Sequence, residues 1–267
     1  MKGIKIPQEH PRAESLRIRE RLIEQFSEGV VATAGLIAHG RGEAFDYLVG
    51  ERTTGPALKA IEAAASALLA AEKPVVSVNG NSAALVAEEM VKLASVVKAR
   101  IEVNLFYRSV EREWAIKELL EEDGAHEVLG VGEDASAKIP ELGSERRRVD
   151  PRGILLADVV LVPLEDGDRT EALVKMGKKV IAIDLNPLSR TAQKASITIV
   201  DNVVRAMPKL IGMAEKLKQD VKKCREILFN FDNEKNLAES ISLIKERLSK
   251  LAENGDYLTL EDENYEL

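Results

Sequence analysis

The sequence contains few of the residues that cross-link a chain or hold a structural metal ion. Its 267 residues include one cysteine, Cys224, and three histidines. A single cysteine excludes an internal disulfide, and a cysteine-rich zinc site would need more ligands of these types. A chain of this length must therefore be stabilised by a buried core of its own.

Long apolar runs and an excess of positive charge are also absent from the sequence. No segment approaches the ~18 consecutive apolar residues that a membrane span needs, and the first 21 residues lack the apolar stretch of a secretory signal. The net charge is −7, and residues 252–267 hold six acidic residues and no basic one. We therefore expect a cytoplasmic protein that binds neither a membrane nor nucleic acid.

Short β-branched runs alternate with longer segments in which every third or fourth residue is apolar. The short runs predict strands at Pro74–Val78, Ile101–Leu105, Val159–Val162, Val180–Ile183 and Ile197–Val200. The longer segments between them are typical of helices that bury one face. This order predicts an α/β fold with a mostly parallel sheet flanked by helices.

Polar residues follow each predicted strand within a few positions. They are Asn79-Gly80-Asn81, Asn104, Glu165-Asp166-Gly167-Asp168, Asp184-Leu185-Asn186 and Asp201-Asn202. Each group alone could form a turn or a helix cap. The carboxyl ends of parallel strands share one edge of the sheet, however, so the groups together predict a ligand crevice at that edge.

The sequence narrows the class of ligand only in part. It has no phosphate-binding P-loop, and although Gly130–Ala135 fits Gly-x-Gly-x-x-Ala, Glu133 and Asp134 would repel a pyrophosphate. We interpret that segment as a loop. Asp184 and Asn186 are better placed to hold a ribose, as an acidic residue at a strand end does in dinucleotide-binding folds.

A second polar cluster lies in the N-terminal part. A helix with Arg17 and Arg19 is followed by residues 33–47, in which glycines flank Arg41 and in which His39, Glu43 and Asp46 lie nearby. A glycine-flanked arginine suits an anion site, because it combines room for the ligand with a fixed charge.

The C-terminal part shows two apolar seams with alternating spacings of four and three residues. They run over residues 203–228 and 237–251. Such seams predict two helices, joined around Asn230–Asn236, that form a hairpin against the body or against a second subunit. Cys224 lies in the first seam, so we expect it to pack rather than to react.

Several long strings are similar to one known family. The strings are His10-Pro11-Arg12, Ser15–Glu20, Gly35–Leu48, Asn79–Asn81, Ala157–Arg169 and Asp184–Thr191. They closely resemble archaeal 4-phosphopantoate–beta-alanine ligases, also called phosphopantothenate synthetases, and the resemblance covers nearly the whole chain. It implies a Rossmann-like homodimer that uses ATP and Mg2+ to join 4-phosphopantoate to beta-alanine. The implied products are 4'-phosphopantothenate, AMP and diphosphate, on the archaeal route to coenzyme A.

The same resemblance implies roles for individual residues. Nucleotide contacts carry over to Arg19, Arg41, Asp184, Leu185, Asn186, Arg190, Thr191, Asn202 and Val203. The candidates for substrate contacts are Arg17, Asn79, Asn81, Arg148 and Arg169. The anionic substrates need cations, and the arginines among these candidates come from a larger pool that includes Arg146. His39 or Glu43 could accept a proton from the beta-alanine ammonium group, and the sequence does not separate them. The ligands of Mg2+ are not identified.

Four segments follow from this interpretation. They are residues 1–72, an N-terminal helical segment that contributes to the site; 73–202, a Rossmann-like nucleotide-binding core; 203–252, C-terminal helices for packing or dimerisation; and 253–267, an acidic tail.

Two alternative functions remain open. An NAD-dependent oxidoreductase would share the sheet, but it would need a glycine fingerprint after the first strand, which residues 79–83 lack. A non-catalytic nucleotide sensor would explain the seams but not the ionisable cluster around Arg41.

Overall fold

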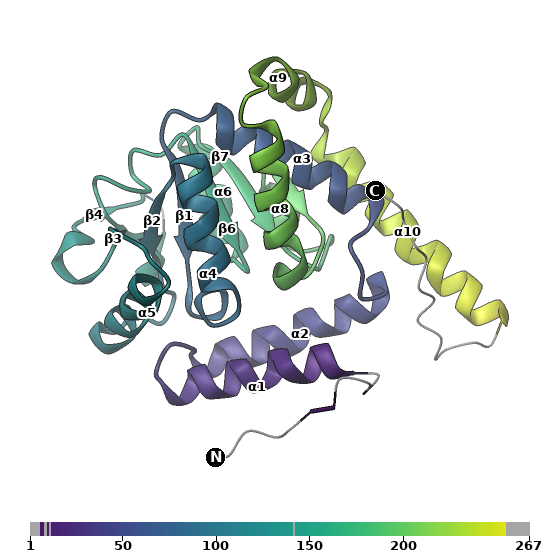
Figure 1. Ribbon diagram of the computed structural model, residues 1–267, viewed down its shortest axis with the longest axis horizontal. Coiled ribbons are helices and arrows are strands. Elements are labelled where there is room, and N and C mark those ends of the chain that lie inside the picture. The colour runs from purple at the N-terminus through teal and green to yellow at the C-terminus, as the bar shows by residue number, and fades with distance from the viewer. Residues whose placement is uncertain (1–5, 8–9, 11, 141, 255–267) are drawn as a thin grey trace.

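The computed structural model describes residues 6–7, 10, 12–140 and 142–254. Pro11 of the string that begins at His10, and residues 255–267 of the predicted acidic tail, lie outside the described residues. The described part forms a six-stranded sheet covered by helices (Figure 1). The strands are β1 Pro74–Val78, β2 Arg100–Val103, β3 Val128–Leu129, β6 Val159–Pro163, β7 Lys179–Ile183 and β8 Ile197–Ile199.

The order of the strands is β3-β2-β1-β6-β7-β8, and every neighbouring pair is parallel. This is the order of doubly wound nucleotide-binding sheets, and it reverses direction between β1 and β6. The predicted α/β fold is confirmed, and the five predicted strands are present with their ends shifted by no more than two residues. The sequence did not predict β3, because two residues are too few for a pattern, nor the antiparallel pair β4 Ala137–Lys138 and β5 Arg148–Val149.

Ten α-helices connect and cover these strands in the described part of the chain. They are α1 Ala13–Ser27, α2 Thr33–Val49, α3 Gly55–Ala70, α4 Gly80–Val97, α5 Val110–Glu122, α6 Gly167–Lys175, α7 Arg190–Lys194, α8 Val203–Leu217, α9 Val221–Asn230 and α10 Asn233–Asn254. Two 3-10 turns, η1 Gly132–Asp134 and η2 Glu145–Arg147, lie in the segment between β3 and β5. The interpretation of residues 130–135 as a loop agrees with η1.

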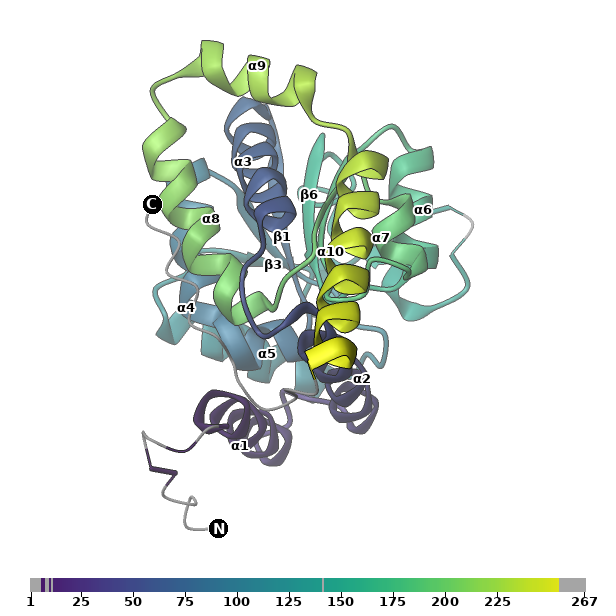
Figure 2. The same ribbon diagram turned by 90° about the vertical axis from the view of Figure 1, so that its right-hand side faces the viewer.

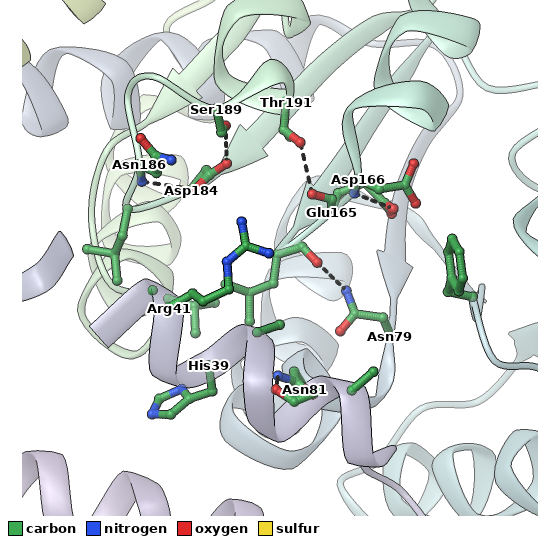
Figure 3. A pocket seen from close by; sticks show the side chains of 18 of the residues that line it. His39, Arg41, Asn79, Asn81, Glu165, Asp166, Asp184, Asn186, Ser189 and Thr191 are labelled. Carbon is green, nitrogen blue, oxygen red and sulfur yellow. Dashed lines mark hydrogen bonds between the residues drawn. The ribbon is translucent and has the colours of Figure 1, made fainter. Parts of the chain in front are cut away.

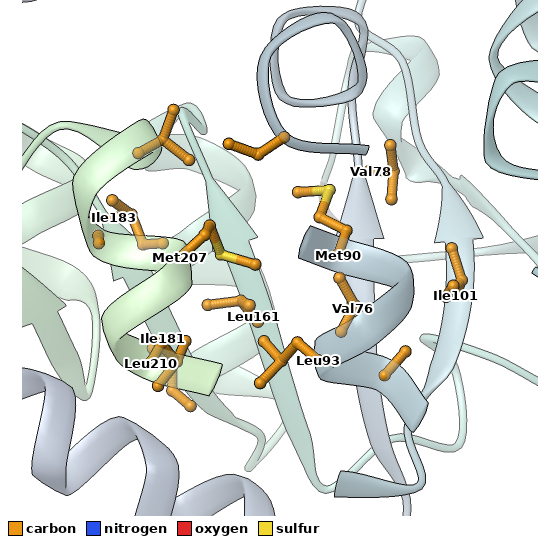
Figure 4. Packing of buried hydrophobic residues seen from close by; sticks show 14 of the residues in the cluster. Val76, Val78, Met90, Leu93, Ile101, Leu161, Ile181, Ile183, Met207 and Leu210 are labelled. Atoms are coloured by element: carbon orange, nitrogen blue, oxygen red, sulfur yellow. The ribbon is translucent and has the colours of Figure 1, made fainter. Parts of the chain in front are cut away.

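The main core lies between the sheet and helices α3, α4 and α8. Alternate side chains of the strands face it, among them Val76 and Leu161, and they pack against Met90 of α4 and Met207 of α8 (Figure 4). Residues one position away face the opposite side of the sheet, where Val160 packs with Leu173 of α6 in a second cluster. Burial on both faces explains why the strands read as continuous apolar runs.

The C-terminal part is helical, as predicted, but its first seam is divided between two helices. Asp220 begins α9 by accepting a hydrogen bond from the Lys223 backbone N–H, and the stripe of α8, which includes Leu210 and Leu217, packs on α3 and α4 of the same chain. Cys224 is buried. Figure 2 shows α9 crossing the end of α3 and α10 returning beside α7. Alternating spacings of four and three residues between apolar side chains occur in any helix that buries one face, so the spacing could not show whether the seam packs on the same chain or on a second subunit.

Helices α1 and α2 lie apart from this cover, beneath the carboxyl ends of the strands (Figure 1). Helix α3, which belongs to the same predicted N-terminal segment, instead packs on the sheet with α8. No helix in the described residues combines the length and the apolar character that a bilayer crossing needs.

Candidate active site

A cavity of about 480 Å³ lies at the carboxyl edge of the sheet, between the strand ends and α2 (Figure 3). This volume is within the range of small-molecule sites. Its position is the one that the sequence predicts, because the loops after β1, β6 and β7 all line it. The strand order reverses at the same place, where doubly wound sheets bind their ligands.

Asn79 fixes the floor of the cavity at the reversal point. Its Oδ1 accepts a hydrogen bond from the Ser82 backbone N–H at 3.0 Å, which begins α4. Its Nδ2 donates to the carbonyl oxygens of Pro163 at 2.8 Å and Leu164 at 3.2 Å. One side chain therefore joins the ends of β1 and β6, and its amide is oriented by the protein.

The β7 side of the cavity is built around a buried carboxylate. Asp184 accepts hydrogen bonds from the Asn186 backbone N–H at 2.9 Å and from the Ser189 hydroxyl. Burial raises the pKa of Asp184, and the positive charge of Arg41 opposes that shift. An ionised carboxylate has lone pairs left for a ligand hydroxyl after two such bonds. Asp184 is thus held rigidly at a strand end, where it can accept from a ribose.

Arg41 extends from α2 into the cavity, opposite the β7 loop (Figure 3). The flanking glycines are not there to relieve crowding, because an added Cβ would have nothing within 4 Å at Gly40 and an ordinary 3.8 Å contact at Gly42. The crowded glycine of α2 is Gly35, where a Cβ would come within 2.2 Å of Asn81 Oδ1. Asn81 uses this space to donate from Nδ2 to the Gly35 carbonyl oxygen at 2.8 Å.

The two candidate proton acceptors have different surroundings. Glu43 accepts hydrogen bonds from Arg19 Nη2 at 2.6 Å and from the Tyr47 hydroxyl at 3.1 Å. Burial would raise the pKa of Glu43, but these bonds outweigh burial and hold the pKa below its usual value. Burial lowers the pKa of His39, so its imidazole is neutral near pH 7 and able to take a proton.

A buried charge network closes the β6 side. Glu165 is 1% exposed and pairs with Arg169 and, at 2.9 Å, with Arg146. Arg146 also pairs with Asp166 at 2.8 Å. Burial raises the pKa of Glu165 and lowers that of Arg146. The network holds Arg146 and Asp166 at the cavity wall while Arg169 lies wholly in the interior.

The structure brings most of the candidate site residues to this one cavity. The residues that line it are His39, Arg41, Glu43, Asn79, Asn81, Asp184, Leu185, Asn186, Arg190, Thr191, Asn202 and Val203. Arg19 reaches only its edge, through Glu43.

Three candidates for substrate contacts lie elsewhere. Arg17 is exposed on α1, Arg148 donates to the Gly132 carbonyl oxygen, and Arg169 is bonded to Glu165 and to the Ser77 hydroxyl. Charge alone did not reveal which arginines face inward.

Other lining residues were not singled out from the sequence. Phe106 and Tyr107 follow β2 at the cavity wall, with ring centroids 5.0 Å apart. Their position directly after a predicted strand could have indicated them. Arg146 is one of three consecutive arginines, and nothing in that run distinguishes the one that turns inward. Among the described residues, no group of three or more His, Cys, Asp or Glu side chains is arranged to hold a metal ion.

Comparisons with known proteins place the chain in a family. The family described as phosphopantothenate/pantothenate synthetase matches residues 56–247. A relative from Thermococcus onnurineus is 55% identical over 254 residues, which cover 94% of this chain and 97% of the relative. A relative from Methanosarcina mazei is 52% identical over 253 residues, which cover 94% of this chain and 99% of the relative. Both relatives are named 4-phosphopantoate–beta-alanine ligase. The chain belongs to the phosphopantothenate/pantothenate synthetase family.

Proposed function

We propose that this protein is a 4-phosphopantoate–beta-alanine ligase, which forms 4'-phosphopantothenate for coenzyme A biosynthesis. The observation that carries the proposal is the identity of 52–55% to archaeal relatives of that name over nearly the whole chain. The cavity supports the proposal, because it combines the cation Arg41, the carboxylate of Asp184, which is placed to accept from a ribose, and the neutral imidazole of His39. The glycine fingerprint that an oxidoreductase would need after β1 is absent from residues 79–83.

ATP is the proposed co-substrate, bound between the β7 loop and α2. Asp184 would accept from the ribose hydroxyls, and Arg41 would contact the phosphates across the cavity. Arg190 lies at the rim, where it pairs with Asp168 at 2.5 Å and Glu171 at 2.6 Å. A phosphate contact from Arg190 would therefore require it to exchange one of these partners.

4-Phosphopantoate would occupy the β1 and β6 side. Leu85, Leu105 and Leu164 give this part of the cavity an apolar wall, which suits the dimethyl group of pantoate. The N-terminus of α4 begins at Gly80 beside them, where the helix dipole favours an anion. The substrate carboxylate would then lie near the nucleotide phosphates.

The proposed reaction activates that carboxylate. A carboxylate oxygen attacks the α-phosphorus of ATP, so that diphosphate leaves and an acyl-adenylate forms. The amine of beta-alanine then attacks the carbonyl carbon, and AMP leaves as the amide bond forms. Arg41 stabilises the negative charge on the phosphates during the first step.

His39 is the proposed general base of the second step. The ammonium group of beta-alanine must lose a proton before it attacks, and the neutral imidazole can take that proton. Glu43 is a weaker candidate, because Arg19 and Tyr47 already hold its carboxylate. We assign Glu43 the role of holding Arg19 at the edge of the site.

Mg2+ is the proposed metal ion, and few protein ligands would hold it beside ATP. Asp166 could hold the ion, because its side chain is 32% exposed at the cavity whereas that of Glu165 is 1% exposed; it would then give up its ion pair with Arg146. When bound, the ion would neutralise charge on the phosphates.

We further infer a cytoplasmic homodimer that contacts a second copy through the C-terminal helices. Phe229 of α9 is 89% exposed, and Ile241 and Leu248 of α10 are partly exposed on the second seam. A stripe of this kind on neighbouring helices suits a dimer contact.

The product assay tests the function directly. Wild-type protein with ATP, Mg2+, 4-phosphopantoate and beta-alanine is expected to form 4'-phosphopantothenate, detected by mass spectrometry. Omission of any one component, or replacement of 4-phosphopantoate by pantoate, is the control. No amide product from the complete mixture would contradict the proposal.

A further inference from the structure

Helix α2 carries His39 and Arg41 but is held to the body of the protein mainly near its ends. It lies beneath the sheet with α1, away from the helices that cover the core (Figure 1). At its N-terminal end, the Gly35 carbonyl oxygen accepts from Asn81 at 2.8 Å. Apolar packing of Leu36 on the main core and of Val49 on a small cluster with Leu237 of α10 also holds α2 at these two ends, so polar contacts are only part of what fixes its position.

The contacts at the other end centre on Asp46. Its Oδ1 accepts from Arg205 Nη2 at 2.5 Å, and its Oδ2 accepts from Arg205 Nη1 at 3.1 Å and from Asn202 Nδ2 at 2.9 Å. Arg205 is held in turn by Asp201, with Nε to Oδ1 at 3.0 Å, and Thr53 donates to Asp201 Oδ2 at 2.6 Å. Asp46 is 5% exposed, so these partners take the place of water around its carboxylate oxygens.

This group joins α2 to the N-terminal end of α8 at the edge of the cavity. Asp46 belongs to α2, Arg205 belongs to α8, and Asn202 caps α8 by accepting from the Val204 backbone N–H. Asn202 also lines the cavity, whereas Asp46 turns away from it toward Arg205. The bidentate geometry of an arginine with a carboxylate fixes orientation as well as distance.

We propose that Asp46 and Arg205 are positioning residues of the ligase reaction, which fix α2 and thereby hold His39 and Arg41 over the cavity. A buried ion pair is often no more stabilising than apolar residues of the same size, so orientation is the property for which this pair is suited. The inference rests on the proposed function, because it concerns the roles of His39 and Arg41.

Asp46→Ala is the main test. It leaves Arg205 paired with Asp201 and so creates no unpaired buried charge. Amides of α2 are expected to exchange hydrogen at least about tenfold faster, while β6 and β7 keep their protection. The KM for ATP is expected to rise, and kcat to fall, by about tenfold each, the scale for loss of a charge-assisted contact. Asp46→Asn keeps the shape and one acceptor oxygen, so it should recover part of both losses.

Asp158→Ala is the matched control. Asp158 also accepts three hydrogen bonds, from the backbone N–H groups of Glu72, Lys73 and Val159, but it lies at the amino edge of the sheet. This variant should lower the melting temperature and leave kcat and KM within about twofold, well below the tenfold effect expected above.

Two results would overturn the proposal. In the first, Asp46→Ala keeps the wild-type hydrogen-exchange rates of the α2 amides and the wild-type KM for ATP. In the second, Asp46→Ala resembles Asp158→Ala, with a lower melting temperature and unchanged kcat and KM. Failure of the proposed function would look different, since the wild-type protein itself would then form no product.

Discussion

Glu102 of β2, which holds the loop after β5, gives a quantitative prediction for how the free energy of unfolding depends on pH. The side chain is completely buried, and its two oxygens accept from the backbone N–H groups of Asp150 at 2.9 Å and Ile154 at 2.5 Å. Burial raises the pKa of Glu102 from 4.5 to about 7, against the two hydrogen bonds, which lower it. Folded protein therefore keeps this proton over a pH range in which unfolded protein has lost it.

The sign of the effect follows from linkage. Between about pH 4.5 and 7 the folded state binds more protons at Glu102 than the unfolded state, so the free energy of unfolding falls as the pH rises. At 1.36 kcal/mol for each unit of pKa, the contribution of Glu102 falls by about 3 kcal/mol over this range. Above pH 7 the loss is complete, and below pH 4.5 it is absent.

Glu102→Gln removes this titration, so urea unfolding of both proteins from pH 4 to 9 measures it. The difference in free energy of unfolding between variant and wild type should shift by about 3 kcal/mol in favour of the variant as the pH rises. Glu226→Gln, at an exposed position of α9, is the control for the substitution itself. A constant difference for Glu102→Gln would refute the reasoning.

Further predictions concern the cavity and the surface. Arg41→Ala should weaken ATP binding in calorimetry by roughly ten- to a hundredfold without unfolding the protein, because the side chain is exposed and charged. His39→Gln should lower kcat by about a hundredfold or more. In the wild type, kcat/KM should rise with pH through a midpoint below 6.5, because burial lowers the pKa of His39. A pH profile of kcat/KM without this rise would contradict the role of His39 as the base. Gly35→Ala should reduce activity, since the new Cβ would come within 2.2 Å of Asn81 Oδ1, whereas Gly40→Ala has open space and should not clash. Leu248→Glu should reduce the mass measured by light scattering, and an unchanged dimer would exclude the second seam as its contact.

Most of the sheet could be predicted because its strands are buried on both faces. Val75, Val76 and their neighbours in β1 must all be apolar, and this leaves a plain signal in the sequence. Placement of polar residues after the strands then located the cavity, because parallel strands share their carboxyl edge. Helix partners were harder, since the stripe of α8 has the same spacing whether it packs on another subunit or on α3 and α4.

The orientation of charged side chains could not be predicted from their positions in the sequence. Arg169 carries the charge expected of a phosphate contact, yet it lies in the interior because Glu165 and Ser77 supply partners there. Asp46 stands in the same short segment as His39 and Arg41, but it turns toward Arg205 of α8, 159 residues away in sequence. Such contacts depend on the tertiary fold, which pattern and spacing do not specify.

The central claim, that the carboxylate is activated by adenylation, can be tested most directly by following an oxygen atom. 4-Phosphopantoate labelled with 18O in its carboxylate is incubated with the wild-type protein, ATP, Mg2+ and beta-alanine, and the nucleotide products are analysed by mass spectrometry. Attack of the carboxylate on the α-phosphorus predicts AMP that carries one 18O atom and unlabelled diphosphate. ADP together with 18O-labelled phosphate would contradict this account, because the label would then have passed through an acyl phosphate.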